Sequence, residues 1–273
     1  MIKGEYVKKT VVITGSTSGI GKELVKIFAN NFNVFASYRN DKLIEQIDNV
    51  EYFYMDMTDR SSISDAAYWL KSKVDKIDIL INVAGCVVAG PMELIDGDSL
   101  REQFEVNTFS HFEFTQNLVS ILENSRVINI SSMSSFGHFP FIGPYGASKR
   151  ALDILFNAFA IENHKNIKVI SLKPGVIATP LWQKSVDKNE NTLTDCDGYE
   201  KEMSFMKLNA LKNTDKGLPV EKVAKFIYTV ANSKNPKSSY TIGKDAKIAQ
   251  ILSLFPQDLI NKIVRFGMKV RIK

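Results

Sequence analysis

Short apolar runs alternate with amphipathic stretches along almost the whole chain, and this alternation limits the possible fold more than any other feature. Six runs are rich in Val and Ile and apolar on both faces: residues 10–14, 33–38, 51–55, 76–82, 126–131 and 167–173. Such runs are typical of strands that are buried on both sides. The repeated order strand, helix, strand therefore predicts an α/β fold with a doubly wound parallel sheet and right-handed crossovers.

The alternation of strands and helices predicts one domain over residues 1–273, because no Gly/Ser linker or low-complexity tract divides the chain. Residues 181–216 interrupt the alternation with a polar, irregular stretch, and a segment this long is expected to be a lid inserted into the domain. A helix at about 219–233 and a short strand at 238–243 follow. Residues 245–273 are expected to form an amphipathic helical tail.

Composition excludes several classes of protein. Hydrophobic residues make up 44% of the chain and charged residues 24%, which is ordinary for a globular protein. The net charge is +5, but the lysines are scattered and not interleaved with aromatic residues, so we expect no nucleic-acid partner. Cys86, Cys196 and three histidines lack ligand spacing, which predicts neither a disulfide framework nor a metal site. Without an apolar leader or an apolar run of 18 residues, a cytoplasmic protein is expected.

The first predicted strand runs into TGSTSGIGKELV, residues 14–25. Gly15, Gly19 and Gly21 follow this strand and open a helix, which is the context that a nucleotide-binding loop requires. Glycines allow the backbone to approach a pyrophosphate, and the helix N-terminus offers free N–H groups. A plain tight turn is the alternative.

Tyr145 and Lys149 lie four residues apart in GPYGASKR, residues 143–150. Pro144 suits a first helical position, so the two side chains share one face of a predicted helix. Such a pair also occurs by chance on many helix surfaces. The remaining motifs decide between the two interpretations.

These motifs, taken together, resemble the short-chain dehydrogenase/reductase family over residues 8–180. TGxxxGIG and YxxxK are joined in order by NVAG at 82–85, INISSMSS at 128–135 and PGVIAT at 174–179. Val83 replaces the second Asn of the family's N-N-A-G pattern. The resemblance implies a Rossmann-type fold and an enzyme that interconverts a carbonyl and an alcohol. The tail is similar to the hydroxysteroid and retinol dehydrogenase-like branch.

The resemblance implies a catalytic group of Asn107, Ser132, Tyr145 and Lys149. Tyr145 would exchange a proton with the substrate oxygen, Ser132 would hydrogen-bond that oxygen, and Asn107 would lie at a distortion of its helix. Ser131 and Ser135 are alternatives to Ser132. A charge ~4 Å from the phenol is worth roughly 4 kcal/mol at a dielectric of ~20, or ~3 pKa units, so Lys149 is expected to lower the pKa of Tyr145. In the family this lysine also binds the nicotinamide ribose.

NADP(H) is favoured over NAD(H) as the cofactor. Tyr38 stands where NAD-dependent members carry an acid, and Arg39 follows it, where a guanidinium could bind a 2′-phosphate. Ser18 could add a hydroxyl, and Asp56 matches the position that contacts adenine. The full expected cofactor site is Gly15, Ser18, Gly19, Ile20, Gly21, Arg39, Asp56, Met57, Asn82, Ala84, Gly85, Tyr145, Lys149, Pro174, Gly175, Ile177 and Thr179.

Apolar side chains between the serine and the tyrosine, and in the expected lid, predict an apolar substrate such as a steroid, a retinoid or a lipid-like ketone or aldehyde. Core packing is the alternative for each of them, and His138 is expected to be structural. The residues are Phe136, Phe139, Phe141, Trp182, Met203, Phe205 and Met206.

Other functions and partners stay open at this point. A sensor or scaffold that binds NADP(H) without turnover is one alternative, and an epimerase or dehydratase of the same family is another. The last helix carries Asp258, Lys262 and Arg265 on one face and Leu259 and Phe266 on the other. It could pack on its own domain, on a partner subunit or, as a peripheral contact, on a membrane. The resemblance implies a homodimer or a homotetramer, as is common in this family.

Overall fold

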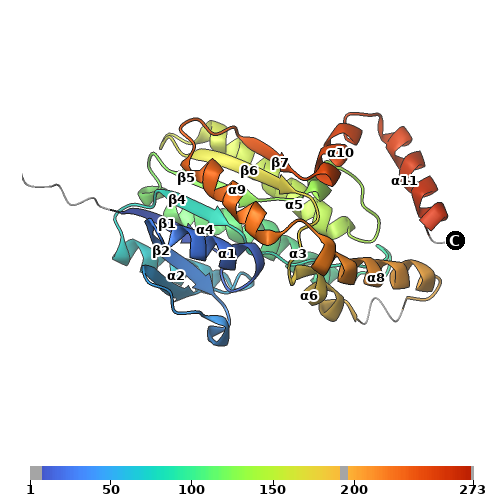
Figure 1. The fold of residues 1–273 in the computed structure, drawn as a ribbon, viewed down its shortest axis with the longest axis horizontal. Coiled ribbons are helices and arrows are strands. Elements are labelled where there is room, and N and C mark those ends of the chain that lie inside the picture. The colour runs from blue at the N-terminus through green and yellow to red at the C-terminus, as the bar shows by residue number, and fades with distance from the viewer. Residues whose placement is uncertain (1–7, 191–195, 272–273) are drawn as a thin grey trace, which may run out of the picture.

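Seven parallel strands form a single sheet in the order β3-β2-β1-β4-β5-β6-β7 (Figure 1). The computed structural model describes residues 8–190 and 196–271. All six strands predicted from the apolar runs, and the short last strand, are confirmed with small shifts at their ends. They are β1 (Lys9–Ile13), β2 (Phe32–Tyr38), β3 (Val50–Tyr54), β4 (Ile79–Asn82), β5 (Arg126–Ile130), β6 (Lys168–Pro174) and β7 (Ser239–Ile242).

The strand order reverses beside β1. The chain builds outward from β1 through β2 to β3, then crosses back so that β4 pairs with the other side of β1. The connections after β1 and β4 therefore leave the sheet toward opposite faces, and a crevice opens between them at the carboxyl ends of the strands. This edge is where the predicted motifs converge.

Helices cover both faces of the sheet (Figure 1). On one face α1 (Gly19–Phe28) and α9 (Val220–Asn232) pack together, and the Phe28 and Tyr228 rings meet edge to face at 4.9 Å. On the other face lie α2 (Arg60–Lys73), α4 (Ser110–Leu118) and α5 (Gly143–Glu162), where Phe53 stacks with Trp69 and Phe114. Two separate apolar layers thus hold the sheet, and the Rossmann-type architecture is confirmed.

The amphipathic stretch over residues 99–122 does not form one continuous helix. It consists of α3 (Gly97–Phe104), a π-helical turn η2 (Glu105–Phe109), α4 and a 3₁₀ turn η3 (Val119–Ile121). Thr108 donates its hydroxyl to the Ser148 carbonyl at 2.8 Å, and the Asn107 side chain bonds to residues outside the helix. These contacts hold the π turn in place, which agrees with the distortion that the resemblance implies at Asn107.

The prediction of an irregular stretch at 181–216 is wrong for most of that range. The structure has α6 (Leu181–Lys188) and α8 (Glu200–Lys216), while residues 191–195 lie outside the described residues. Tertiary contacts fix α6, because the Trp182 indole donates to the Ile177 carbonyl at 2.9 Å and Asn189 bonds to the backbone of Val87 and Ala89. Its polar composition reflects an exposed position and not the absence of a helix.

The tail forms α10 (Lys244–Leu252) and α11 (Gln257–Arg271), as predicted, with residues 272–273 outside the described part. α11 stands apart from the sheet (Figure 1). Ile260 is buried, whereas Leu259 is 43% exposed and Phe266 70% exposed, so most of the apolar face is uncovered in the single chain. Among the described residues, no helix has the length and apolar content needed to cross a membrane. Two short 3₁₀ turns complete the fold, η1 (Asp41–Leu43) and η4 (Met133–Phe136).

Candidate active site

One cavity of about 480 Å³ lies at the carboxyl edge of the sheet and collects most of the predicted site residues. Asn107, Gly21, Asp56 and Asn82 were also predicted, but they support the cavity from behind or beside it and are not part of its wall. The predicted residues in the wall are Gly15, Ser18, Gly19, Ile20, Arg39, Met57, Ala84, Gly85, Ser132, Tyr145, Lys149, Pro174, Gly175, Ile177 and Thr179.

The glycine loop is shaped by close backbone contacts. Gly15 has a φ of +63°, and a Cβ there would lie 2.8 Å from the Ala84 Cα, so only glycine fits. A Cβ on Gly21 would lie 2.2 Å from the Gly15 carbonyl oxygen. The Thr14 hydroxyl accepts from the Val83 N–H at 2.9 Å and ties this loop to the end of β4. The first turn of α1 thus faces the cavity with its N–H groups, as an anion site requires.

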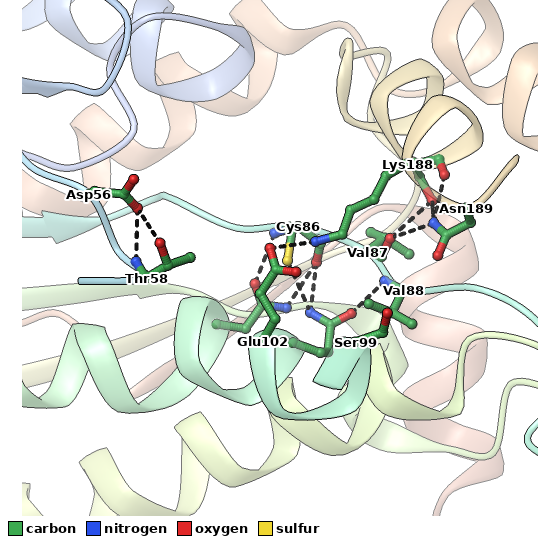
Figure 2. Close-up of polar contacts among 12 residues, drawn as sticks. Asp56, Thr58, Cys86, Val87, Val88, Ser99, Glu102, Lys188 and Asn189 are labelled. Carbon is green, nitrogen blue, oxygen red and sulfur yellow. Dashed lines mark hydrogen bonds and ion pairs between the residues drawn. The ribbon is translucent and has the colours of Figure 1, made fainter. Parts of the chain in front are cut away.

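The end of β2 carries Tyr38 and Arg39 into the cavity wall, so the cation of Arg39 lies next to Tyr38 at this edge of the cavity. Asp56 follows β3 but is turned toward Thr58. Its carboxylate accepts from the Thr58 N–H at 2.9 Å and from the hydroxyl at 2.8 Å (Figure 2). The neighbouring Met57 lines the cavity instead.

Tyr145 is 8% exposed, and Ser132 lines the same cavity. Burial raises the pKa of the Tyr145 phenol, and a hydrogen bond with the Ser132 side chain opposes that rise. Ser132 also caps η4, because its hydroxyl accepts from the Ser134 N–H at 3.1 Å. The alternatives Ser131 and Ser135 donate to backbone carbonyls of Lys149 and Ser132. The geometry therefore favours Ser132 among the three serines.

Lys149 is held by a backbone carbonyl in this structure. Its ammonium donates to the Ile130 carbonyl at 2.9 Å, at the end of β5, and burial lowers its pKa to about 8. The groups that move the pKa of Tyr145 are the surrounding protein, Ser132 and Cys86. The expected lowering of the tyrosine pKa by Lys149 is therefore wrong for this arrangement, because the lysine is held by a carbonyl and desolvation dominates.

Asn107 is fully buried behind the cavity. Its Oδ1 accepts from the Cys86 N–H at 2.9 Å, and its Nδ2 donates to the Cys86 carbonyl at 3.0 Å and to the Ser148 hydroxyl at 3.1 Å. A Cβ on Gly85 would lie 3.2 Å from Asn107 Oδ1 and 3.6 Å from Lys149 Nζ. Asn107 thus fixes the segment after β4 beside the lysine.

His111 is a site residue that the sequence did not indicate. Its Nε2 lies 2.8 Å from the Ala84 carbonyl, and since a carbonyl oxygen only accepts, Nε2 carries the proton. Burial, aided by the charge of Lys149, lowers the pKa of His111 to about 3. The histidine therefore holds the NVAG segment in its neutral form. A lone histidine on a helix carries no spacing signal that could have revealed this role.

Charged side chains of α3 and α6 also line the cavity without having been predicted. Figure 2 shows Lys188 extending over Cys86 to Glu102, with Nζ and Oε1 2.6 Å apart. One turn earlier on α6, Lys184 donates to the Ser18 hydroxyl at 3.3 Å. These contacts join residues that are 86 and 166 positions apart, so no local pattern could indicate them.

The apolar residues proposed for substrate divide into two groups. Phe139 and Trp182 line the cavity, together with Val87, Ile142 and Leu181. The others lie outside the cavity and contact other parts of the protein. Lys173 lies over the Phe136 ring at 5.0 Å, and the Phe141 ring meets the Tyr199 ring edge to face. Met203 is buried, and Phe205 and Met206 are half-buried. His138, which is expected to be structural, accepts at Nδ1 from the Gln257 side chain at 2.8 Å.

Residues 9–190 match a family model described as short chain dehydrogenase. A relative in Ornithobacterium rhinotracheale, named NADPH-dependent 3-dehydrocapnine reductase, is 31% identical over 94% of this chain and 96% of its own length. A relative in Bacteroides thetaiotaomicron, named 3-ketodihydrosphingosine reductase, is 27% identical over 96% of this chain and 98% of its own length.

The fold is also found among solved structures. A short chain dehydrogenase from Burkholderia cenocepacia, solved in complex with NADP, superposes with a TM-score of 0.74. The two chains are 21% identical, over 94% of this chain and 98% of that one. At this identity the likeness concerns the fold alone.

The buried neutral His111 predicts a loss of stability in acid. Unfolding restores an ordinary pKa near 6.5, so the unfolded chain binds more protons between about pH 6.5 and 3. The contribution is complete above about pH 6.5, and a few kcal/mol are lost as the pH falls through this window. Urea unfolding from pH 7.5 to 4.5 measures the slope.

His111→Gln should flatten this dependence, because the amide can donate to the Ala84 carbonyl without titrating. The exposed His164→Gln is the matched control and should leave the slope unchanged. An unaltered slope in His111→Gln would assign the acid sensitivity to other groups.

Proposed function

The chain belongs to the short-chain dehydrogenase family, and we propose that it is an NADP(H)-dependent reductase that interconverts a carbonyl and an alcohol on an apolar substrate. The observation that carries the proposal is the pairing of Tyr145 with Ser132 in the wall of a cavity that also receives the glycine loop. A sensor without turnover would not need a phenol paired with a hydroxyl in the cavity that receives the nucleotide loop.

The glycine loop suits the diphosphate of a dinucleotide. Backbone contacts leave no room for a side chain at Gly15 or Gly21, and the loop brings the α1 N-terminus to the cavity. Arg39 in the same wall supports NADP(H) over NAD(H). The Ornithobacterium relative is named NADPH-dependent and the Burkholderia structure contains NADP, which is in line with this cofactor.

The chain's own residues would handle the proton and the substrate oxygen. When bound, the reduced nicotinamide supplies a hydride for the carbonyl carbon. Ser132 donates a hydrogen bond to the carbonyl oxygen, and Tyr145 delivers a proton to it as charge develops there. Burial keeps the tyrosine protonated near neutral pH, which is the form that a proton donor requires. Alcohol oxidation uses the same groups in reverse.

Lys149 and Asn107 would act beside this pair. A lysine whose pKa is about 8 is mainly charged at pH 7 and can place an ammonium near the ribose hydroxyls of the cofactor. Asn107 would position the Cys86 backbone and keep the π turn open next to Lys149. Epimerisation or dehydration would use the same four residues, and the reductase names of the relatives favour carbonyl reduction.

The substrate is proposed to be a lipid-like ketone. Phe139, Ile142, Leu181 and Trp182 give the cavity an apolar wall beside Tyr145, between η4 and α6. The Bacteroides relative is named for the ketone of a dihydrosphingosine, which favours a lipid over the steroid or retinoid considered from the sequence. The 181–216 segment, which carries Trp182, would act as the lid of this site.

The uncovered face of α11 is proposed to pack against a second subunit, in a homodimer or homotetramer. Leu259, Ile263 and Phe266 are exposed in the single chain, and such a row of apolar side chains is typical of an interface. Lys262 and Arg265 on the same helix would instead favour an anionic membrane surface. We propose a cytoplasmic location for the assembly.

Tyr145→Phe removes the proton donor and keeps the ring. We expect kcat/KM to fall by about 10²- to 10⁴-fold, the usual range for one acid–base group, with the Kd of NADPH nearly unchanged. Tyr68→Phe, on the surface of α2, is the matched control. Steady-state assays of NADPH oxidation with a panel of lipid ketones measure kcat/KM. A loss smaller than tenfold would contradict the role of Tyr145.

Arg39→Ala removes the proposed partner of the 2′-phosphate. Hydrogen bonds to a charged group are worth about 1.5–3 kcal/mol, so NADPH should bind about 10- to 100-fold more weakly. NADH binding should hardly change, because NADH has no 2′-phosphate. Calorimetric titration with both nucleotides provides the comparison, and equal losses for the two would show that Arg39 does not contact that phosphate.

Deletion of residues 256–273 tests the role of α11. We expect sedimentation velocity to show a smaller assembly for the shortened chain, and neither form to float with liposomes of anionic phospholipid. The single variant Phe266→Asp should reproduce the change in assembly with the helix kept. If the full chain floats with the liposomes and the shortened chain does not, α11 contacts a membrane and the proposed subunit contact is wrong.

A further inference from the structure

α6 crosses the cavity and contacts both of its walls. Near its start Lys184 donates to the Ser18 hydroxyl of the glycine loop, and at its end Lys188 forms an ion pair with Glu102 of α3 (Figure 2). Leu181 and Trp182, which precede Lys184, and Ser185, which follows it, also line the cavity. A molecule bound along the carboxyl edge of the sheet must therefore pass beneath α6.

Contacts at both ends fix the position of this helix. Just before it, the Thr179 side chain lies 3.3 Å from where a Cβ on Gly19 would be, so the chain enters α6 against the glycine loop. Just after it, the Asn189 amide donates to the Val87 carbonyl at 2.9 Å and its Oδ1 accepts from the Ala89 N–H at 3.0 Å. Lys184 is thus presented to the glycine loop by a fixed helix.

The cations of the cavity have different partners. The Lys188 ammonium is neutralised by Glu102, which is the only acid among the described residues of the wall. Lys149 donates to a carbonyl under the site, and Arg39 lies at the end of β2. Lys184 has a hydroxyl as its partner. Its charge is therefore available to an anion at the glycine loop.

Ser18, the partner of Lys184, lies at the start of α1. It is the N-cap residue of α1, but its side chain makes no capping hydrogen bond to that helix and instead accepts from Lys184. The first N–H groups of α1 are therefore open toward the cavity, at the place where the lysine arrives. A helix N-terminus and an ammonium that converge on one point form a site for a phosphate group.

We propose that Lys184 binds the diphosphate of the dinucleotide, exchanging its contact with Ser18 for a phosphate oxygen. This inference rests on the proposed nucleotide-dependent function and adds a residue from α6 to the glycine loop as a second part of the diphosphate site. Because the diphosphate is common to NADPH and NADH, Lys184 contributes affinity without choosing between them. That choice belongs to Arg39.

The test is the affinity of Lys184→Met for nucleotides, measured by calorimetric titration without any turnover. We expect about tenfold weaker binding of NADPH, of NADH and of ADP, which carries the diphosphate without nicotinamide or 2′-phosphate. Adenosine, which has no phosphate, should bind equally to both forms. Lys184→Arg should keep the affinity within a few fold, and an unchanged melting temperature without ligand verifies the fold of each variant.

Lys201→Met is the matched control, because Lys201 is exposed on α8 and lies outside the cavity wall. Unchanged ADP binding in Lys184→Met would overturn the proposal, as would a loss confined to NADPH or an equal loss in Lys201→Met. A wild-type protein that binds none of these nucleotides would instead overturn the proposed function. The two failures are therefore distinguishable.

Discussion

The seven strands share one direction, and the arrangement of the site depends on this constraint. In a parallel sheet every strand ends at the same edge, so the glycine loop after β1, Arg39 after β2, the NVAG segment after β4 and Ser132 after β5 meet there although the sequence spreads them over more than a hundred residues. The two apolar layers make the sheet rigid enough to hold these groups at fixed separations. Backbone geometry then refines the edge, because Gly15 can approach Ala84 only without a side chain.

Burial sets the protonation states in the floor of the site. Tyr145, Lys149 and His111 are all withdrawn from water, and in each case desolvation is the largest influence on the pKa. The same effect therefore acts in different directions: it keeps the phenol protonated, weakens the hold of the lysine on its proton and keeps the imidazole neutral. One environment prepares a proton donor, an ammonium of moderate pKa and an uncharged support within a single cluster.

The sequence pattern predicts the strands and the glycine loop, because these parts of the molecule depend on residues that are close together in the chain. The strands were found because each is buried on both faces and rich in β-branched residues, and the glycine loop because its spacing serves one geometry. Resemblance added Ser132, Tyr145 and Lys149, which the structure gathers in one cavity. His111, Glu102 and Lys188 could not be predicted, since each acts through a partner distant in sequence. The composition of α6 does not reveal a helix, because its polar residues are mostly exposed and tertiary contacts fix it in place. Spacing on a helix places Lys149 beside the phenol, but it does not reveal a competing carbonyl.

The π turn at η2 has a consequence for how this chain can change. It contains one more residue than an α-helical path would need, and a single deletion there would allow α3 and α4 to join into one regular helix. Such a deletion would leave α3 and α4 nearly in phase, because a π turn fits one extra residue into about one turn of helix. The apolar side of α4 would stay on the sheet, whereas Asn107 would lose the widened turn from which it reaches Cys86. The extra residue therefore serves the site and not the core, and a chain that lost it would be expected to keep its fold and lose the Asn107 contacts.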